Sequence, residues 1–519
     1  MKKGILLSRQ LLKSTVIVSS MTLISRILGF VRDMLIARLF GVDVTTDAFF
    51  VAFKIPNFFR RLFAEGAFAH AFVPIITDYR EQGTKTALQL FVDRASGTLA
   101  VFLFALTVLG VLCAPVIIFI IAPGFAMQGT QFELSVLLLK ICLPYLFFIG
   151  LVAFAGGILN AHGRFVVPAL TPVFLNICMI IAAVWWAPLM TQPATALAWG
   201  VFAAGVVQLL FQVPALLQLG LFPRLKWGFA DPVVKKMLQQ LVPAIFSVSV
   251  TQINLLLDTL IASFLAVGSV SWLYYSDRLV EFPVGILGLA LGTVILPRLA
   301  KSYALQVQGA FANTLDWGLR WVILLGMPAT IGLVVLAEPM ISTLFQYKEF
   351  SLLDMQNSAL SLRAYAVGLL GYIAIKVLVS GFTSRQDMQT PVRYGLWSMG
   401  LSLAMNVVLV FPLAHAGLAL ATSLGALFNA GLLLLKLYKD QVYRPMSGWG
   451  WFSVRVLLAS LAMFFALYFW VDVNAWQHWQ SAERVMQLLK WIIIGLLIYS
   501  ATLLLSGLRW QHLSDDCRI

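Results

Sequence analysis

The sequence predicts an all-α polytopic membrane protein with about fourteen transmembrane helices. Its composition and the lengths of its apolar runs predict this class. Of the 519 residues, 61% are hydrophobic and only 11% are charged, whereas soluble domains carry about 25% charged residues. The mean hydropathy is +0.91. The hydrophobic residues gather in runs of about 20, which is the length of a helix that crosses a bilayer.

Each apolar run of spanning length predicts one helix. In chain order, the predicted spans cover residues 15–40, 46–76, 95–122, 134–160, 168–189, 194–221, 238–267, 271–298, 317–346, 358–382, 391–412, 416–437, 451–471 and 487–507.

The net charge of +14 is distributed over short loops and does not form one basic patch, so we expect no nucleic-acid partner. Basic residues occur at the N-terminus, in alternate loops such as Arg224–Lys236 and Lys436–Arg444, and in the C-terminal tail. Most intervening loops carry no Lys or Arg, with Lys348 and Arg484 as exceptions. By the positive-inside rule, both termini are predicted to be cytoplasmic.

The first predicted helix has a polar face. At about 100° per residue, Arg26 and Asp33 share one stripe with Ser19. A neighbouring stripe holds Thr22, Ser25, Gly29 and Arg32. Ionisable groups at membrane depth cost about 2.5 to 3.5 kcal/mol each on insertion scales, so they normally face a protein interior or a watery cavity.

The second span adds further charges at Asp47, Lys54, Arg60 and Arg61. Two interpretations remain open for this region. The charges form either an internal salt-bridge lattice or a cavity that receives an anion. The surplus of cations over carboxylates argues against purely internal pairing.

The eighth span contains a second charged group. Arg278 and Glu281 are three residues apart, and Asp277 and Glu281 are four apart, so they are neighbours on one helix face. Small residues follow at Gly285, Gly288 and Gly292 and permit close helix packing. In the seventh span, Asn254 and Asp258 either bind a coupling cation or form a packing contact.

A weak internal repeat relates two six-helix halves at an offset of about 220 residues. Pro74 and Pro297 both precede a basic segment, and Gly157–Arg164 resembles Gly381–Arg385. We predict pseudo-symmetric lobes at residues 1–222 and 223–445, a plan typical of transporters. Residues 446–519 add two helices and a tail, which serve either as plain anchors or as a surface for a long lipid tail.

Motifs for catalysis are absent from the sequence. It has no phosphate-binding Gly-rich loop, no zinc-protease motif and no Gly-x-Ser-x-Gly nucleophile motif. The four cysteines have no paired spacing. We therefore expect no enzyme activity, no catalytic residue, no metal site and no cofactor.

The charged segments resemble the MurJ/MviN family of bacterial lipid II flippases, in the multidrug/oligosaccharidyl-lipid/polysaccharide exporter superfamily. The resemblance rests on Ser19-Ser20-Met21-Thr22, Ser25-Arg26, Leu28-Gly29-Phe30, Arg32-Asp33, Thr46 to Lys54, Arg60-Arg61 and Phe63 to Phe68 in the first half. In the second half it rests on Gly268 to Trp272, Asp277-Arg278, Glu281-Phe282-Pro283, Ser384 to Asp387 and Thr390-Pro391.

The resemblance implies transport of undecaprenyl-pyrophosphoryl-MurNAc-pentapeptide-GlcNAc across the bacterial inner membrane by alternating access, for peptidoglycan synthesis, cell wall biogenesis and cell shape. It implies that Arg26, Arg32 and Arg278 bind the diphosphate. Its implied gating or cavity partners are Asp33, Asp47, Lys54, Arg60, Arg61, Glu65, Asp277 and Glu281. The expected partners are this lipid, membrane lipid and a coupling ion, which is sodium, chloride or a proton, and we expect a monomer.

Rival functions remain at this stage. The nearest is an exporter of another polyprenyl-linked oligosaccharide or of drugs, although a drug exporter is expected to present acidic sites for cationic drugs. An integral-membrane glycosyltransferase also gathers cations but requires large loops with carboxylates, which this chain lacks. A scaffold without transport activity leaves the charged helices unexplained.

Overall fold

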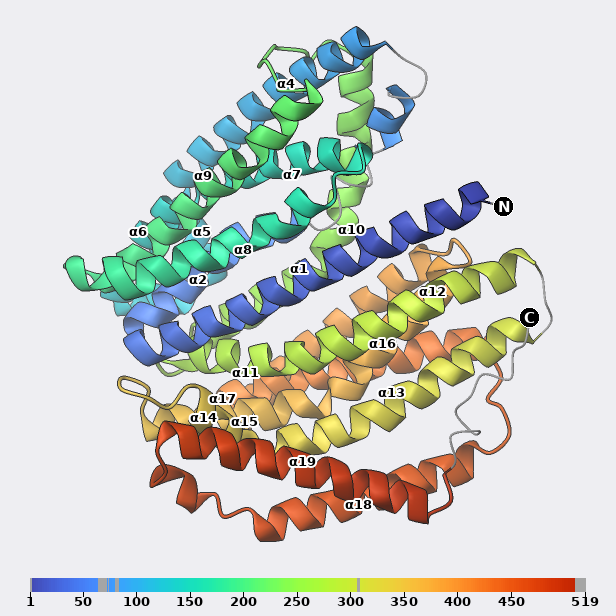
Figure 1. Cartoon of the computed structure of the whole chain (residues 1–519). Coiled ribbons are helices and arrows are strands. Elements are labelled where there is room, and N and C mark those ends of the chain that lie inside the picture. Colours follow the sequence, from blue (N-terminus) through green and yellow to red (C-terminus); the bar gives the residue numbers. More distant parts are fainter. Residues whose placement is uncertain (1, 64–71, 73, 80–83, 306–308, 509–519) are drawn as a thin grey trace. The chain divides into compact units, whose positions relative to one another are not determined.

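The computed structural model describes residues 2–63, 72, 74–79, 84–305 and 309–508 (Figure 1). Within these ranges the regular structure is helical, with no β-strand. The chain divides into two compact units, Met1–Gly268 and Ser269–Ile519. Each unit is described below by itself.

The first unit packs its helices in neighbouring pairs. Helix α1 packs on α8, α2 on α6, and α9 on both α7 and α8. Its apolar core includes the buried rings of Phe72, Phe91 and Phe154. The elements are α1 (Lys2–Phe40), α2 (Val44–Leu62), α4 (Lys85–Leu112), α5 (Ala114–Ile121), η2 (Pro123–Gln128), α6 (Thr130–Cys142), α7 (Tyr145–Ala161), α8 (Val166–Ile181), η3 (Ala182–Trp186), η4 (Ala187–Leu189), α9 (Pro193–Leu219) and α10 (Pro232–Ala262).

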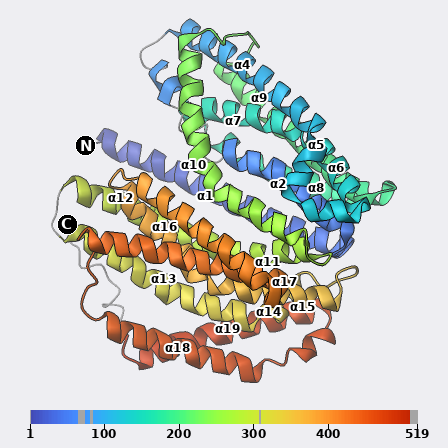
Figure 2. The same cartoon turned by 180° about the vertical axis from the view of Figure 1, so that it is seen from behind.

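In the second unit, α16 and α17 pack together, and α15 packs on both α17 and α11. The final pair, α18 and α19, lie side by side against α13 and α14 (Figures 1 and 2). The elements are α11 (Ser269–Pro283), η5 (Val284–Gly288), α12 (Leu289–Ala304), α13 (Ala310–Val335), α14 (Ala337–Leu344), α15 (Leu352–Val367), α16 (Leu369–Thr383), α17 (Gln389–Lys439), α18 (Trp449–Trp470), η6 (Asn474–Gln477) and α19 (Ser481–Leu505).

Local sequence explains several helix boundaries. Asp43 caps α2 by accepting the backbone N–H groups of Thr45 and Thr46, because the first N–H groups of a helix have no partner within it. Ser351 and Asp354 form the reciprocal capping box of α15. Gly220, with a φ of +68°, ends α9 in the left-handed conformation that glycine adopts without strain.

The structure confirms a helical membrane protein but not a count of fourteen spans. Ten segments of the described chain are long and apolar enough to cross a membrane. One of them, α17, holds two predicted spans, because the non-helical backbone of Ala414 (φ 46°, ψ −128°) divides it. The predicted span 95–122 is divided at Cys113 into α4 and α5.

Along the sequence, the boundary between the two compact units follows Gly268, whereas the boundary between the lobes predicted from the repeat follows residue 222. In the structure, α10 contacts α2, α4 and α5 and belongs to the first unit. The boundary between the compact units therefore lies in the segment that connects α10 to α11. The lobes at 1–222 and 223–445, with 446–519 outside them, stay a prediction from the repeat.

A buried aspartate fixes the connector that follows α9. Asp93 of α4, 2% exposed, accepts the backbone amide of Arg224 at 2.9 Å and the side-chain amide of Gln89 at 2.6 Å. Its second oxygen lies 3.3 Å from Nζ of Lys226. The connector therefore cannot leave α4 without exposing or unpairing a buried carboxylate.

The second unit has a matching contact. Asp316 of α13, 1% exposed, accepts the backbone amide of Met446 at 3.2 Å, the Tyr443 hydroxyl at 2.8 Å and Nε1 of Trp449 at 2.6 Å. Asp93 and Asp316 lie about 220 residues apart, the offset of the internal repeat. Each holds the connector that follows the long helix α9 or α17, and this correspondence supports the repeat.

Candidate functional site

Arg32 and Asp33 form a buried ion pair in α1. Nη2 and Nε of Arg32 lie 2.7 Å and 2.9 Å from Oδ1 of Asp33, and the two residues are 5% and 1% exposed. Both N–H donors converge on one oxygen of the carboxylate, and hydrogen bonds between two charged groups are stronger than those between neutral ones. The pair sets the direction of the guanidinium plane.

A second contact holds Arg32 against α8. Its Nη1 donates to Oδ1 of Asn176 at 3.0 Å, and Nδ2 of Asn176 donates to the carbonyl of Ser25 at 2.9 Å. Gly29 faces the Asn176 amide, and a Cβ added there would lie 3.5 Å from it. The Phe53 ring centre lies 5.8 Å from the Arg32 guanidinium carbon, so a cation–π contact adds to the pairing.

Arg26 is in a different environment from Arg32. Its side chain is exposed, and no hydrogen bond or ion pair of it occurs within the part of the chain that the structure describes. Its guanidinium therefore offers its planar set of donors to a ligand. A phosphate accepts such donors two at a time.

Asp47 and Lys54 of α2 contact residues near the end of the first unit. Oδ2 of Asp47, which is 1% exposed, accepts the backbone amide of Gly268 at 2.7 Å. Nζ of Lys54 donates to Oγ1 of the buried Thr259 on α10. Both charges therefore connect α2 to the segment that leads out of the unit.

The C-terminal end of α2 carries Arg60 and Arg61, both half-buried. Nε of Arg60 donates to Oδ1 of Asn57 at 3.0 Å. Cations in the last turn favourably oppose the helix dipole. Glu65, a further predicted gating or cavity partner, lies outside the described residues.

In the second unit, Arg278 and Glu281 form an ion pair on α11, with Nη1 and Oε2 2.8 Å apart. Nη2 of Arg278 also donates to the Tyr274 hydroxyl at 3.2 Å, and its guanidinium carbon lies 4.8 Å from the Tyr274 ring centre. The Arg278 side chain is 22% exposed, so it is partly open to a ligand. Asp277 is half-buried beside it.

The structure thus brings Arg32 together with Asp33, Lys54 with Thr259, and Arg278 with Glu281. Sequence reasoning missed Asn176, Tyr274 and Gly268 as partners. The contact of Tyr274 with Arg278 could have been predicted, because Tyr274 lies one helical turn before Arg278. Asn176 had only the weak signal of an amide in an apolar helix.

Helix α10 carries the polar side chains of Asn254 and Asp258 within an apolar stretch. Asp258 is buried, and Oδ1 of Asn254 is buried and accepts no hydrogen bond within the described residues. The described ranges contain no group of three or more His, Cys, Asp and Glu residues arranged to hold a metal ion.

Comparisons with known proteins agree along nearly the whole chain. The family model described as "Lipid II flippase MurJ" matches residues 36–501. A "probable lipid II flippase MurJ" of Vibrio cholerae is 46% identical over 514 residues, covering 98% of each chain. That of Haemophilus influenzae is 44% identical, covering 95% of this chain and 99% of its own. A "lipid II flippase MurJ" of Burkholderia cenocepacia is 39% identical, covering 97% and 98%.

Solved structures agree with this match. A lipid II flippase MurJ in an inward closed conformation superposes with a TM-score of 0.80 at 25% identity, covering 94% of this chain and 98% of its own. An inward-facing multidrug transporter of the MATE family superposes with a TM-score of 0.68 at 14% identity, covering 82% and 97%. The second likeness shows a shared fold only.

Proposed function

The chain belongs to the MurJ family of lipid II flippases, and on that premise we propose how its charged residues carry lipid II. The protein is a lipid II flippase, a transporter for peptidoglycan synthesis. The observation that supports this function most directly is the near full-length match to flippases of this family. The cations of α1 and α11 give this activity a chemical basis, because the cargo carries a diphosphate.

In this proposal, Arg26, Arg32 and Arg278 bind the diphosphate, and two of them are kept neutralised while no cargo is present. Arg32 is paired with Asp33, and Arg278 with Glu281. A buried guanidinium without a counter-charge costs several kcal/mol. The carboxylates of Asp33 and Glu281 therefore neutralise the two arginines in the absence of cargo, and the diphosphate replaces them as the counter-charge when lipid II binds. Arg26, which is exposed, makes the first contact.

The remaining charged residues act as gates. Asp47 holds the Gly268 amide and Lys54 holds Thr259, so α2 is tied to the end of α10. Alternating access requires α2 and this segment to separate in one of the two states. Arg60, Arg61, Glu65 and Asp277 complete the proposed set of cavity partners.

The cargo moves from the cytoplasmic to the periplasmic leaflet of the inner membrane, and both termini lie in the cytoplasm. The lobes 1–222 and 223–445 alternate around the head group, while residues 446–519 accompany the polyprenyl tail. The protein acts as a monomer, and sodium, chloride or a proton couples to the cycle. The positive-inside distribution of Lys and Arg supports the orientation.

An exporter of another polyprenyl-linked oligosaccharide is the main alternative. Complementation separates the two. Cells depleted of their own lipid II flippase are supplied with this protein, or with Arg26→Ala or Arg278→Ala at matched membrane levels. We expect growth with the wild type and lysis with the variants. Failure of stably expressed wild type to restore growth would favour the alternative.

A further inference from the structure

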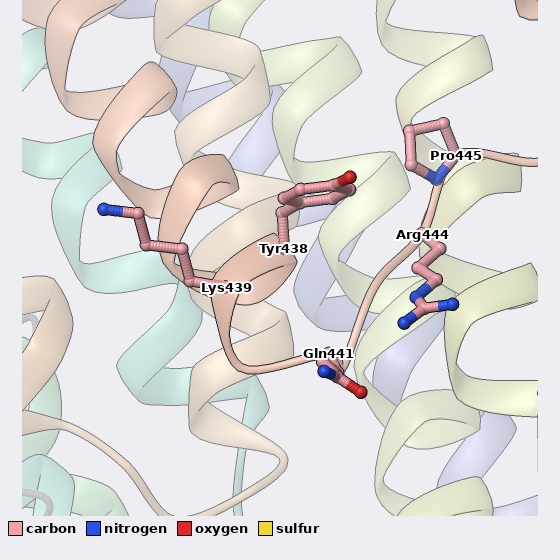
Figure 3. Close-up of a pocket in the computed structure, with 5 residues that line it drawn as sticks. All are labelled: Tyr438, Lys439, Gln441, Arg444 and Pro445. Atoms are coloured by element: carbon pink, nitrogen blue, oxygen red, sulfur yellow. The ribbon is translucent and has the colours of Figure 1, made fainter.

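We propose that the turn between α17 and α18 binds the phosphate of an anionic phospholipid head group. A pocket of about 470 Å³ opens at this turn, lined by Tyr438, Lys439, Gln441, Arg444 and Pro445 (Figure 3). The site is separate from the proposed cargo-binding arginines and goes beyond the flippase activity.

The lining residues have the chemistry of a phosphate site. Figure 3 shows Tyr438, Gln441, Arg444 and Pro445 around one side of the turn, while the Lys439 amino group extends on the other side. The guanidinium, phenol and amide groups supply N–H and O–H donors. The fork of Arg444 matches two phosphate oxygens. Lys439 adds positive charge without lying in the same cluster.

The positive charge of the turn is not cancelled. Asp440 is the one acidic residue between Lys436 and Gly448, and it pairs with Lys436, whose Nζ lies 2.7 Å away. Within the described ranges, Arg444 and Lys439 take part in no ion pair, and both are exposed. Arg444 and Lys439 are therefore able to bind an anion from outside the chain.

The pocket is held in shape by a buried carboxylate. Tyr443 and Met446, on either side of Arg444 and Pro445, both donate hydrogen bonds to Oδ1 of Asp316. Oδ2 of Asp316 pairs with Arg320 at 2.8 Å. The Arg444 backbone is thus anchored at both ends, so less conformational freedom is lost when a ligand binds.

The surroundings favour a lipid over a soluble anion. Exposed aromatic side chains flank the turn, with Tyr438 55% and Trp451 61% exposed. Such rings gather at the boundary between the hydrocarbon and the head groups. Basic pockets on the cytoplasmic side of membrane helices bind acidic lipid head groups. In the first unit, Lys226 of the matching connector is instead paired with Asp93.

The test measures lipid retained by the purified full-length protein, using native mass spectrometry with phosphatidylglycerol or phosphatidylcholine. We expect the wild type to retain phosphatidylglycerol selectively and Arg444→Gln to bind it about fivefold more weakly, the effect of one cation near a membrane surface. Lys236→Gln, which removes an exposed cation of α10, is the matched control and should bind like the wild type.

Asp316→Ala removes the oxygen that accepts from Tyr443 and Met446, and it separates a built site from diffuse attraction. It raises the net charge by one, so diffuse attraction predicts tighter binding, whereas loss of the anchor predicts weaker binding. Tyr443→Phe removes one anchoring hydrogen bond without changing the charge, and it replaces Asp316→Ala in the test if that variant does not fold. Equal binding by Arg444→Gln and Lys236→Gln would overturn the proposal, and so would unchanged binding by Tyr443→Phe. Displacement of the lipid by free inorganic phosphate would overturn the choice of a lipid. None of these readouts depends on flipping.

Discussion

Asp47 and Gly268 are joined by a hydrogen bond although 221 residues separate them, with Oδ2 of Asp47 2.7 Å from the Gly268 amide nitrogen. Gly268 has a φ of +97° and ends the first unit. A buried carboxylate of α2 thus fixes a left-handed residue at the exit from α10. The two residues of this contact can be changed separately, and the stability of each variant can be measured.

Asp47→Ala should lower the free energy of unfolding by about 1 to 3 kcal/mol, because the Gly268 amide loses its acceptor in a buried setting. Asp47→Asn keeps an acceptor oxygen and should lose less. The check is thermal unfolding of the purified protein in detergent. Equal stability of the alanine variant and the wild type would contradict the role of this bond.

Gly268→Ala should also destabilise the protein, because its positive φ is strained for any residue with a Cβ. The matched control is Gly292→Ala in α12, where an added Cβ meets nothing within 4 Å. The control should be neutral or slightly stabilised. The same unfolding measurement compares the two, and an equal effect of both changes would refute the account of Gly268.

Arg32→Ala and Arg26→Ala should have different effects: the first should lower the stability of the protein, and the second should abolish flipping. Arg32→Ala leaves Asp33 buried without its counter-charge, and removing one partner of such a pair costs about 3 to 5 kcal/mol. Arg26→Ala should abolish flipping with little change in unfolding temperature, because its side chain is exposed. Adding Asp33→Asn to Arg32→Ala should restore part of the stability. A stable Arg32→Ala protein would contradict the buried pairing.

The connector after α9 should respond to acid through Asp231. Burial tends to raise the pKa of Asp231, but hydrogen bonds from Arg94 and the backbone amides of Val233 and Val234 lower it overall. A lowered pKa in the folded state gives stability at neutral pH that is lost as the pH falls below about 4. Asp231→Asn should therefore flatten the acid limb of the unfolding temperature measured from pH 6 to pH 3. Because Arg94 is 40% exposed, the effect should be small.

Gly97→Ala should release this connector from α4. An added Cβ would lie 2.1 Å from the carbonyl oxygen of Lys226, so the backbone must move. The check is limited trypsin digestion, which should cleave at Arg224 and Lys226 faster than in the wild type. Gly431→Ala in α17, where nothing lies within 4 Å, is the control. Unchanged cleavage of Gly97→Ala would contradict the close packing.

Sequence patterns predicted the membrane class and the charged faces, because periodicity and hydropathy are local properties. Arg32 and Asp33 were recognised as functional candidates from their positions in an apolar helix. The hydrogen bond of Arg32 to Asn176, 144 residues away, could not be predicted from the sequence, because it depends on how α1 packs on α8. The Asp93 and Asp316 anchors were missed for the same reason.

The proposed transport of lipid II by the cationic residues of this chain can be measured in cells. The most direct measurement is the fraction of lipid II exposed on the outer face of cells depleted of their own flippase, with wild type, Arg26→Ala or Lys236→Gln at matched membrane levels. We predict exposure of lipid II with the wild type and with Lys236→Gln, and its retention inside with Arg26→Ala. Retention with stable wild type would contradict the function, and full exposure with Arg26→Ala would contradict the proposed role of Arg26.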